Sequence, residues 1–538
     1  MVSGKQTRPI IGRMNPYFIF PGRSTALPRL VACALAATVL LSACGGGGGS
    51  PGATTGSSST VGATPTTPGT RTPDAIPTNF QTYANLCVKP RSGTDPYTGV
   101  TYKDSQGTLL DELKFLRGWV DLDYLWYNEI PNNFYMADFT NTLDYFDKLK
   151  TPAVTASGKP KDQFHFTYTT AEWNALNTAG QEVGYGLTWS RDSTTAPRAW
   201  YASIVEPGSP AAIAGLQRGD RLMAIDGVDF VNTSSTSGVD TINAGLFPER
   251  SGESHRLTLQ RAGANIDVTL TASVVTSASV KNAKVIETAT GRVGYLVFDD
   301  FNATAEKQLI DAFTMLKSQN VSDLVIDMRY NGGGLLGIAG ELGYMIAGPT
   351  AKGKTFERMV YNGKTGPDQT ISFQDTAYGF SAPNAVRQGQ ALPYLGLKRV
   401  TVLTTSGTCS ASESVINGLR GIDVQVDIIG GGTCGKPYGF TPQDNCGTTY
   451  FAIQFQGVNA KNFGDYADGF APTCTVRDDL SHALGDTSEN MLAAALNYRN
   501  TNTCSPTATA LTGVQVSETQ MTLVRPAVKE IAVLPRTR

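Results

Sequence analysis

The chain has 538 residues, of which 41% are hydrophobic and 17% charged, and its formal net charge is −2. This composition is typical of globular domains with enough apolar residues to form cores, and the length corresponds to several domains. Nucleic-acid binding requires a basic excess on one face, so the near-neutral balance argues against nucleic acid as the main partner.

Residues 1–44 have the pattern of an export signal. Basic residues precede the apolar run LVACALAATVLLSAC, which is too short and alanine-rich for a membrane-spanning helix. The run ends in LSAC, and with its last residue, Cys44, it resembles a bacterial lipobox, in which the cysteine is acylated. We therefore predict a lipid anchor at Cys44 in the bacterial cell envelope. An ordinary signal peptide with a chance cysteine is the alternative. Gly45 is not an aspartate, which favours the outer membrane, facing the periplasm, by analogy with lipoprotein sorting.

Two different segments follow the signal. Residues 45–80 are rich in Gly, Ser, Thr and Pro and offer little apolar surface to bury, which predicts a flexible linker. Residues 81–180 are rich in aromatic residues, and DELKFLRGWVDLDYLWYNEI has apolar residues at helical spacing. NTLDYFDKLK predicts a second helix. We expect a small N-terminal helical domain with Trp119 and Trp126 in its core.

Residues 181–275 predict short strands joined by tight turns. The strand AWYASIV leads through PGSP into a short helix that ends at Gly215, and Asp226-Gly227 predicts a hairpin. Five or six strands with one short helix, together with the string GSPAAIAGLQRGDRLMAIDG, resemble a PDZ domain. That resemblance implies that an extended peptide pairs with a sheet edge. Its terminal carboxylate would be bound by the loop of Gly184, Tyr185, Gly186 and Leu187. The alternative is that this loop only begins a strand.

Residues 276–504 alternate between strands and helices, which predicts a mostly parallel sheet. The strand segments are GYLVFDDF, DLVIDMR, KRVTVLTT and VQVDIIG, and TAEKQLIDAFTMLKSQN is an amphipathic helix. The predicted fold class is therefore a mixed α/β multidomain chain. Residues 505–538 are expected to form a polar C-terminal tail.

Six cysteines lie beyond the lipobox, and an even number in an exported chain predicts disulfides. Their spacing contains no CxxC pair, which argues against a zinc site. Pairing of Cys434 with Cys446 and of Cys87 with Cys504 is conceivable, but neither follows from the sequence. The six are Cys87, Cys409, Cys434, Cys446, Cys474 and Cys504.

The segments TSGTCSASESV and GGTCGKPYGF contain the candidate catalytic residues. Ser410 lies where a strand passes into a helix, so free helix N–H groups beside its hydroxyl could stabilise an oxyanion. A serine nucleophile needs a base, and His165, His255 and His482 lie outside any recognisable catalytic loop. Lys436, in a turn of small residues one strand further on, could serve as the base if burial keeps its amine neutral.

Together, these segments resemble the C-terminal processing peptidases, or tail-specific proteases, of the tricorn-like serine peptidases, whose core is of the tricorn/ClpP-crotonase-like type. The resemblance covers about residues 181–500 and includes DMRYNGGGLL, TCSASE, GGGTCGKPYGF and DGFAPT. It implies that Ser410 is the nucleophile, Lys436 the base, and Ala411 and Gly333 the N–H donors of an oxyanion hole. The implied activity is cleavage of C-terminal tails or unfolded polypeptides with apolar C-termini by a Ser-Lys dyad, without cofactor or metal. No oligomeric state follows from the resemblance.

One position departs from the family pattern. The family often has a glutamine four residues after the lysine, whereas this chain has Phe440, with Gln443 and Asp444 further on. This departure motivates a second hypothesis, in which the chain is a catalytically degenerate adaptor or scaffold that binds peptides through its PDZ domain.

Two further interpretations concern the serine segment. SASE alone is a helix-capping pattern, with Ser410 at the N-cap and Glu413 three residues later. Cys409 beside Ser410 and Cys434 near Lys436 also motivate a third hypothesis, an enzyme regulated by oxidation and reduction.

Overall fold

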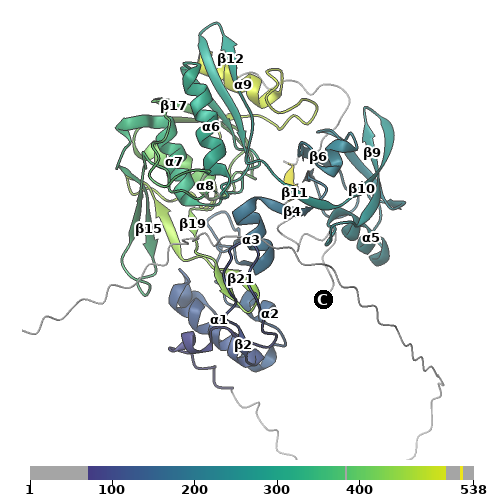
Figure 1. Ribbon diagram of the computed structural model, residues 1–538, viewed down its shortest axis with the longest axis vertical. Coiled ribbons are helices and arrows are strands. Elements are labelled where there is room, and N and C mark those ends of the chain that lie inside the picture. The colour runs from purple at the N-terminus through teal and green to yellow at the C-terminus, as the bar shows by residue number, and fades with distance from the viewer. Residues whose placement is uncertain (1–70, 382–384, 505–520, 525–538) are drawn as a thin grey trace, which may run out of the picture. The chain divides into compact units, whose positions relative to one another are not determined.

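The computed structural model describes residues 71–381, 385–504 and 521–524 (Figure 1). The predicted signal, the predicted lipid-attachment residue Cys44 and most of the predicted linker lie outside these ranges. All the elements named below belong to one unit, residues 75–538. Within the described ranges, no helix combines the length and the apolar character needed to cross a membrane.

The N-terminal region contains the two predicted helices and one more. α1 (Leu109–Asp123) begins at a reciprocal capping box formed by Thr108 and Asp111. Trp119 and Trp126 are buried in the core of this region, as predicted. The remaining elements are η1 (Phe80–Tyr83), β1 (Leu86–Cys87), β2 (Ser105–Gln106), η2 (Tyr127–Glu129), η3 (Met136–Asp138), α2 (Thr142–Lys148), β3 (Phe166–Thr169) and α3 (Thr170–Ala179).

A segment from much later in the chain, residues 443–453, completes this N-terminal region. β21 (Thr448–Phe451) pairs with β3 on one side and with β20 (Gln443–Asn445) on the other, antiparallel in both cases. Tyr450, Ala452 and Ile453 join the same apolar core as Trp119. Residues 443–453, which lie within the range 276–504 predicted above to form the parallel sheet, therefore pack with residues more than 250 positions earlier in the chain.

The PDZ region forms an antiparallel sheet with the strand order β10-β9-β7-β6-β5-β24, and β8 pairs with β7. The predicted hairpin is present, and Asp226 and Gly227 both have positive φ in the turn between β7 and β8. A separate pair, β4 with β11, flanks this sheet. The strands are β4 (Gln181–Gly184), β5 (Leu187–Arg191), β6 (Trp200–Val205), β7 (Arg221–Ile225), β8 (Val228–Asp229), β9 (Ser254–Arg261), β10 (Ala264–Thr271) and β11 (Ser273–Thr276).

The prediction of one helix in this region was wrong. The short predicted helix is α4 (Pro210–Ile213), and a second helix, α5 (Thr236–Leu246), follows. Its sequence TSGVDTINAGL contains two glycines and several β-branched residues, all poor helix formers. The side chains of Val239, Ile242 and Leu246 are buried, so packing rather than intrinsic propensity holds α5 in place.

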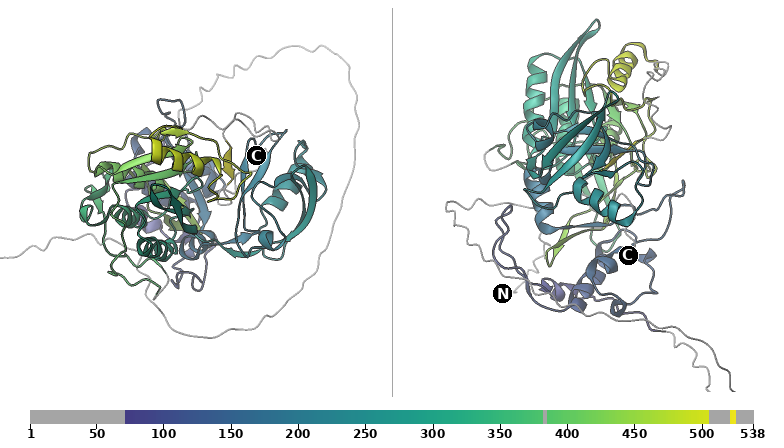
Figure 2. Two further views of the ribbon diagram at one scale, coloured as in Figure 1. Left: turned by 90° about the horizontal axis from the view of Figure 1, so that it is seen from above. Right: turned by 90° about the vertical axis from the view of Figure 1, so that its right-hand side faces the viewer.

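Part of the expected polar C-terminal tail forms a strand. Thr522–Val524 form β24, which pairs antiparallel with β5 at the edge of the PDZ sheet. Val524 is buried in the apolar core of the PDZ region. Figure 2 shows this short yellow strand beside the PDZ strands.

The third region contains the predicted, mostly parallel sheet, with the order β12-β13-β14-β17-β18-β23. Only the pair of β12 with β13 is antiparallel. A smaller sheet has the order β16-β15-β22-β19. The strands are β12 (Val280–Thr288), β13 (Gly291–Phe298), β14 (Asp323–Asp327), β15 (Thr355–Tyr361), β16 (Gln369–Ser372), β17 (Arg399–Thr404), β18 (Gln425–Gly430), β19 (Tyr438–Gly439), β22 (Phe455–Val458) and β23 (Cys474–Thr475).

Helices cover both faces of the main sheet (Figure 1). Along β13, Leu296 and Phe298 face a core shared with α6 (Ala305–Ser318), α7 (Leu336–Ala347) and α8 (Ala411–Gly421). The alternate residues Val293, Tyr295 and Val297 face α9 (Asn490–Thr501). Burial on both faces explains why these strands read as continuous apolar runs in the sequence. A 3₁₀ turn, η4 (Gly348–Thr350), follows α7.

Three disulfides are present among the described residues, but not with the pairings considered above. Cys87 bonds Cys446, Cys409 bonds Cys434, and Cys474 bonds Cys504. The sequence offered no means of choosing among the pairings, because each bond joins segments that only the tertiary fold brings together.

Candidate active site

Ser410 lies between the carboxyl end of β17 and the first turn of α8. It is the N-cap of α8, with φ 56° and ψ −116°. A positive φ is uncommon for a residue with a side chain, and backbone strain of this kind is concentrated at functional sites. The serine segment is therefore held in an unusual conformation by its surroundings.

The carboxylate of Glu413 joins the Ser410 segment to the Lys436 turn. Its Oε2 accepts hydrogen bonds from the backbone N–H of Ser410 at 3.0 Å and of Lys436 at 2.8 Å. Its Oε1 accepts from the Thr433 hydroxyl at 2.6 Å and from the Gly435 N–H at 2.9 Å. The expected capping role of Glu413 is confirmed, and the structure adds its contacts to the lysine turn.

Glu413 is fully buried, so its contacts determine its charge. Burial raises the pKa of this carboxyl, while the hydrogen bonds from Thr433, Lys436, Gly435 and Ser410 act in the opposite direction. A buried acceptor with four donors is costly to remove, because each donor would lose its partner. Glu413 therefore fixes the spacing of the two backbone segments.

Lys436 is buried, and its ammonium faces two aromatic rings. Nζ lies 4.1 Å from the ring centroid of Phe440 and 4.8 Å from that of Phe164, a residue of the N-terminal region. Burial favours the neutral amine, whereas contact with aromatic faces favours the charged ammonium. Phe440, at the position where the family often has glutamine, thus contacts the lysine directly.

The glycine loop that follows β14 packs against the serine. The backbone carbonyl of Asn331 accepts hydrogen bonds from the Cys409 N–H at 2.9 Å and from the Ser412 hydroxyl at 3.1 Å. Gly333 has φ +100°, and a Cβ there would lie 2.7 Å from the Ser410 Cβ. Only glycine permits so close an approach.

The two predicted oxyanion donors differ in their surroundings. Ala411 is the first residue of α8, where helix geometry leaves the N–H without an intrahelical acceptor. The Gly333 N–H instead donates to the Asn331 Oδ1 at 2.9 Å. In this conformation the Gly333 amide is engaged by a side chain, so it could serve an oxyanion only after Asn331 releases it.

A buried ion network holds the base of the glycine loop. Arg329 donates to Asp327, Asp478 and Glu489 at 2.7 to 3.0 Å. Arg218, from the PDZ string GLQRGD, donates to Asp478 at 2.6 Å and to the Tyr330 hydroxyl at 2.6 Å. Burial alone would raise the pKa of Asp478, but the charges of Arg218 and Arg329 lower it to about 2. The carboxylate therefore stays charged and ties the PDZ region to the glycine loop.

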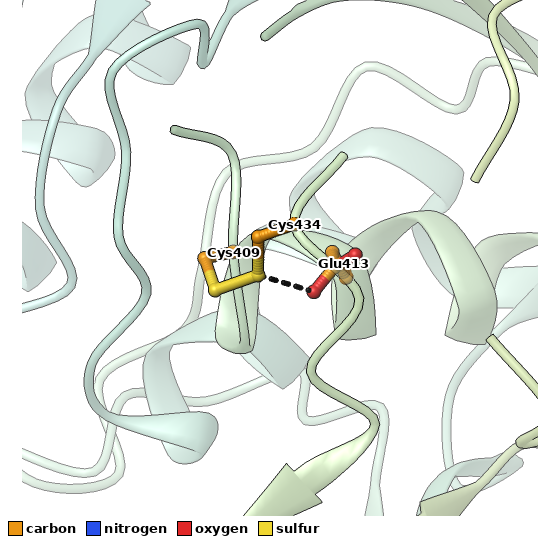
Figure 3. A group of neighbouring side chains, drawn as sticks. All are labelled: Cys409, Glu413 and Cys434. Atoms are coloured by element: carbon orange, nitrogen blue, oxygen red, sulfur yellow. Dashed lines mark hydrogen bonds between the residues drawn. A yellow bond between two sulfur atoms is a disulfide. The ribbon is translucent and has the colours of Figure 1, made fainter. Parts of the chain in front are cut away.

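A disulfide lies directly between the serine and lysine segments. Figure 3 shows Cys409, Glu413 and Cys434 together, and the Cys434 sulfur lies 3.3 Å from the Glu413 Oε2. Because a disulfide sulfur carries no hydrogen, this is a close contact rather than a hydrogen bond. The three ligand-type atoms lie within 4.8 Å of one another, but the bonded cysteines offer no thiolates for a metal ion.

The three histidines have partners of their own. His165 Nε2 lies 2.9 Å from the Phe146 carbonyl oxygen, and Nδ1 lies 3.5 Å from Asp162. His255 pairs with Asp226 and His482 with Asp479, each at 2.6 Å. Each of these partners lies outside the Ser410 and Lys436 segments.

The predicted carboxylate-binding loop lines a cavity in the PDZ region. Gly184, Tyr185, Gly186 and Leu187 form one side of a cavity of about 560 Å³, and residues of α5 line another. Gly186 has φ +72°, and a Cβ there would lie 2.3 Å from the Ser209 Cβ, so the loop packs closely on the start of α4. The structure therefore places these four residues at a concave site beside a sheet edge.

Comparison with known proteins agrees with this architecture. Residues 292–474 match peptidase family S41, and residues 202–261 match the PDZ domain. The crystal structure of a Bacteroides fragilis NCTC 9343 protein assigned to the S41 proteases aligns with a TM-score of 0.55 and 25% identity. The alignment covers 72% of this chain and 97% of that one. The fold is thus that of a PDZ-containing S41 peptidase.

Two proteins with similar sequences are C-terminal processing proteases. The "Carboxyl-terminal-processing protease" of Synechocystis sp. (strain ATCC 27184 / PCC 6803 / Kazusa) is 29% identical over 266 residues, which are 48% of this chain and 54% of that protein. The "Carboxy-terminal processing protease CtpA" of Bacillus subtilis (strain 168) is 27% identical over 43% of this chain and 44% of that protein. The chain is therefore similar to C-terminal processing proteases, and it spans about half the length of these relatives.

The sequence analysis missed three contributors to the site. Phe164 lies in the N-terminal region, and nothing in the sequence connects it with Lys436. Asn331 lies within the quoted DMRYNGGG loop, but its contacts to Cys409, Ser412 and Gly333 are visible only in the structure. Glu413 was interpreted as a cap, and its reach to Lys436 depends on the turn after β18.

Proposed function

We propose that the chain is a serine endopeptidase that uses a Ser410–Lys436 dyad to cleave C-terminal tails or unfolded polypeptides in the bacterial cell envelope. The observation that carries the proposal is the shared Glu413 carboxylate. It fixes the backbones of Ser410 and Lys436 to one oxygen atom within the S41-matched range. A dyad needs its two residues held at a constant separation, which this contact supplies.

In the proposed reaction, the Ser410 hydroxyl attacks the scissile carbonyl while neutral Lys436 accepts its proton. The Ala411 N–H donates to the developing oxyanion. Gly333 supplies the second donor once Asn331 has released its N–H. The amine product leaves with the proton from Lys436, and water then hydrolyses the serine ester. None of these steps uses a metal ion or a cofactor.

The remaining parts of the proposal concern binding and location. The PDZ region would bind an extended, apolar C-terminal segment, with the carboxylate at the loop of residues 184–187. Lipid attachment at Cys44 would hold the protein at the outer membrane, facing the periplasm. The linker would separate the anchor from the folded unit.

The test uses the full chain purified in detergent, with an unfolded protein that ends in an apolar segment as substrate. Mass spectrometry locates the cuts. We expect Ser410→Ala and Lys436→Ala each to lower the rate by a factor of about 10⁴. Ser406→Ala and Lys398→Ala, at exposed residues near the same strand, should keep it. Cutting that survives Lys436→Ala would show that another group is the base.

A peptide-binding adaptor is the second candidate, and the aromatic surroundings of Lys436 favour it. Two ring faces beside Nζ favour a charged lysine, which cannot accept a proton. If no substrate is cut by any variant while peptides still bind to the PDZ region, the adaptor function replaces the peptidase function.

A further inference from the structure

The PDZ edge strand already has a partner, and it comes from the end of this chain. Thr522, Leu523 and Val524 pair with Arg191, Ser190 and Trp189, respectively. Val524 is only 2% exposed and packs into the apolar core of the PDZ region. A peptide ligand of a PDZ domain would use the same kind of edge pairing.

The direction of the strand is also that of a ligand. As the residue number rises from Thr522 to Val524, its partner on β5 falls from Arg191 to Trp189, towards Leu187. β24 therefore runs towards the loop of residues 184–187, where a ligand's carboxyl end would bind. The opposite direction would have given parallel pairing with β5.

The strand and the cavity share one groove. Val524 lines the same cavity as Gly184, Leu187 and Trp189, and Leu246 of α5 lies on its other side. β24 thus takes up the part of the edge along Trp189–Arg191, while the end near the loop borders open space of about 560 Å³. A second extended chain could not pair with Trp189–Arg191 while β24 is there.

The connection to the folded core permits this contact within one molecule. Cys504 is fixed to Cys474 of the core sheet, and sixteen residues separate it from Met521. A tether of that length keeps the segment at an effective concentration on the order of millimolar. Weak pairing by three residues is then enough to compete with a peptide from solution.

We propose that residues 522–524 are an intramolecular ligand of the PDZ groove, and that a polypeptide binds there by displacing them. Only molecules with an empty groove can bind the peptide, so the apparent peptide affinity equals the intrinsic affinity multiplied by the fraction of molecules whose groove is empty. The inference concerns binding. It rests on the proposed function only in that the displacing polypeptide would be a peptidase substrate.

The test measures binding of a fluorescent peptide with the sequence of residues 515–524 and a free carboxyl end, by anisotropy, to the full chain in detergent. Val524→Asp places a charge in a buried apolar position and should release the segment. If the groove is filled in about nine molecules of ten, we expect roughly tenfold tighter peptide binding. Val516→Asp, the same change elsewhere in the tail, should leave the affinity as it is.

A second variant controls for a direct effect of the new aspartate charge on peptide binding. A chain that ends at Met521 lacks β24 and keeps every residue of strands β5 to β10. It should bind the peptide as tightly as Val524→Asp or more tightly. Unchanged affinity in both variants would overturn the inference. An affinity of the parent chain that rises on dilution would assign the segment to a second copy and also overturn it.

The outcomes separate this inference from the proposed function. Tighter binding without cutting of any substrate supports the intramolecular ligand and argues against the peptidase. Cutting by the parent chain, with equal peptide affinity in all variants, supports the peptidase and rejects the intramolecular ligand.

Discussion

The PDZ groove and the Ser410 site are both built where a chain segment meets the edge or end of a strand, but different forces hold the segments. In the groove, backbone pairing and one buried side chain, Val524, hold β24. At Ser410, a disulfide and a buried carboxylate with four donors hold the segments. One molecule thus combines a segment held by the pairing of three residues with a site held by a covalent bond and buried hydrogen bonds.

Removal of the Glu413 carboxylate should have the largest effect, because it releases the Ser410 site and leaves the PDZ groove as it is. In Glu413→Ala, Ser410 and Lys436 lose their common acceptor, and the buried donors remain unpaired. We expect at least about a hundredfold loss of peptidase activity and roughly 3 kcal/mol of lost stability. Initial rates and thermal unfolding measure the two effects, and the peptide affinity of the groove should be unchanged.

The control for this prediction is Glu287→Ala, at an exposed glutamate that pairs with Arg292. It should alter neither rate nor stability measurably. Full activity in Glu413→Ala would mean that the carboxylate does not position the dyad.

The disulfide between Cys409 and Cys434 provides the next test. Its removal by Cys409→Ala with Cys434→Ala opens a link between residues 25 positions apart and should cost about 3 kcal/mol. Activity should fall roughly tenfold, because the serine and lysine segments then lose the covalent bond that joins them and keep only hydrogen bonds. Urea unfolding and initial rates measure these changes.

A second disulfide of similar loop length serves as a control that distinguishes an effect on stability from an effect on catalysis. Cys474 and Cys504 lie 30 positions apart, and their removal should cost similar stability without the loss of activity. Equal activity losses in the two double variants would show that the first disulfide acts only through stability. That result would also remove the hypothesis of an oxidation-controlled site.

Phe440→Gln has the smallest expected effect. It removes the ring nearest to Nζ of Lys436 and with it a contact worth about 1 kcal/mol to the charged ammonium. A larger neutral fraction should raise activity near neutral pH about threefold. Phe463→Gln, at an exposed phenylalanine, is the control. A rate that falls in Phe440→Gln alone would mean that the ring positions the lysine.

Much of this molecule could be predicted because local patterns agree with the fold. Apolar runs such as DLVIDMR gave buried parallel strands, and the GSPAAIAGLQRGDRLMAIDG string gave the turns and strands around α4. Ser410 was placed at a strand-to-helix junction for the same reason, and the structure has it at the N-cap of α8. In these segments propensity, periodicity and packing favour the same conformation.

The missed features depend on distant partners. α5 has weak intrinsic propensity and is stabilised by its buried face. β24 is three residues long and forms only because β5 offers an unpaired edge. The approach of Phe164 to Lys436 requires the N-terminal region to pack against the segment beyond the lysine. None of these interactions leaves a periodic signal in the local sequence.

The bond between Cys87 and Cys446 spans 359 positions and encloses the PDZ region together with both Ser410 and Lys436. A single break of the backbone anywhere from residue 88 to residue 445 would therefore leave the two fragments covalently joined. In a compartment that contains other proteases, a molecule nicked in an exposed loop would keep its parts together and its composition intact. Such nicking would become visible only after reduction, as two bands where the unreduced protein shows one.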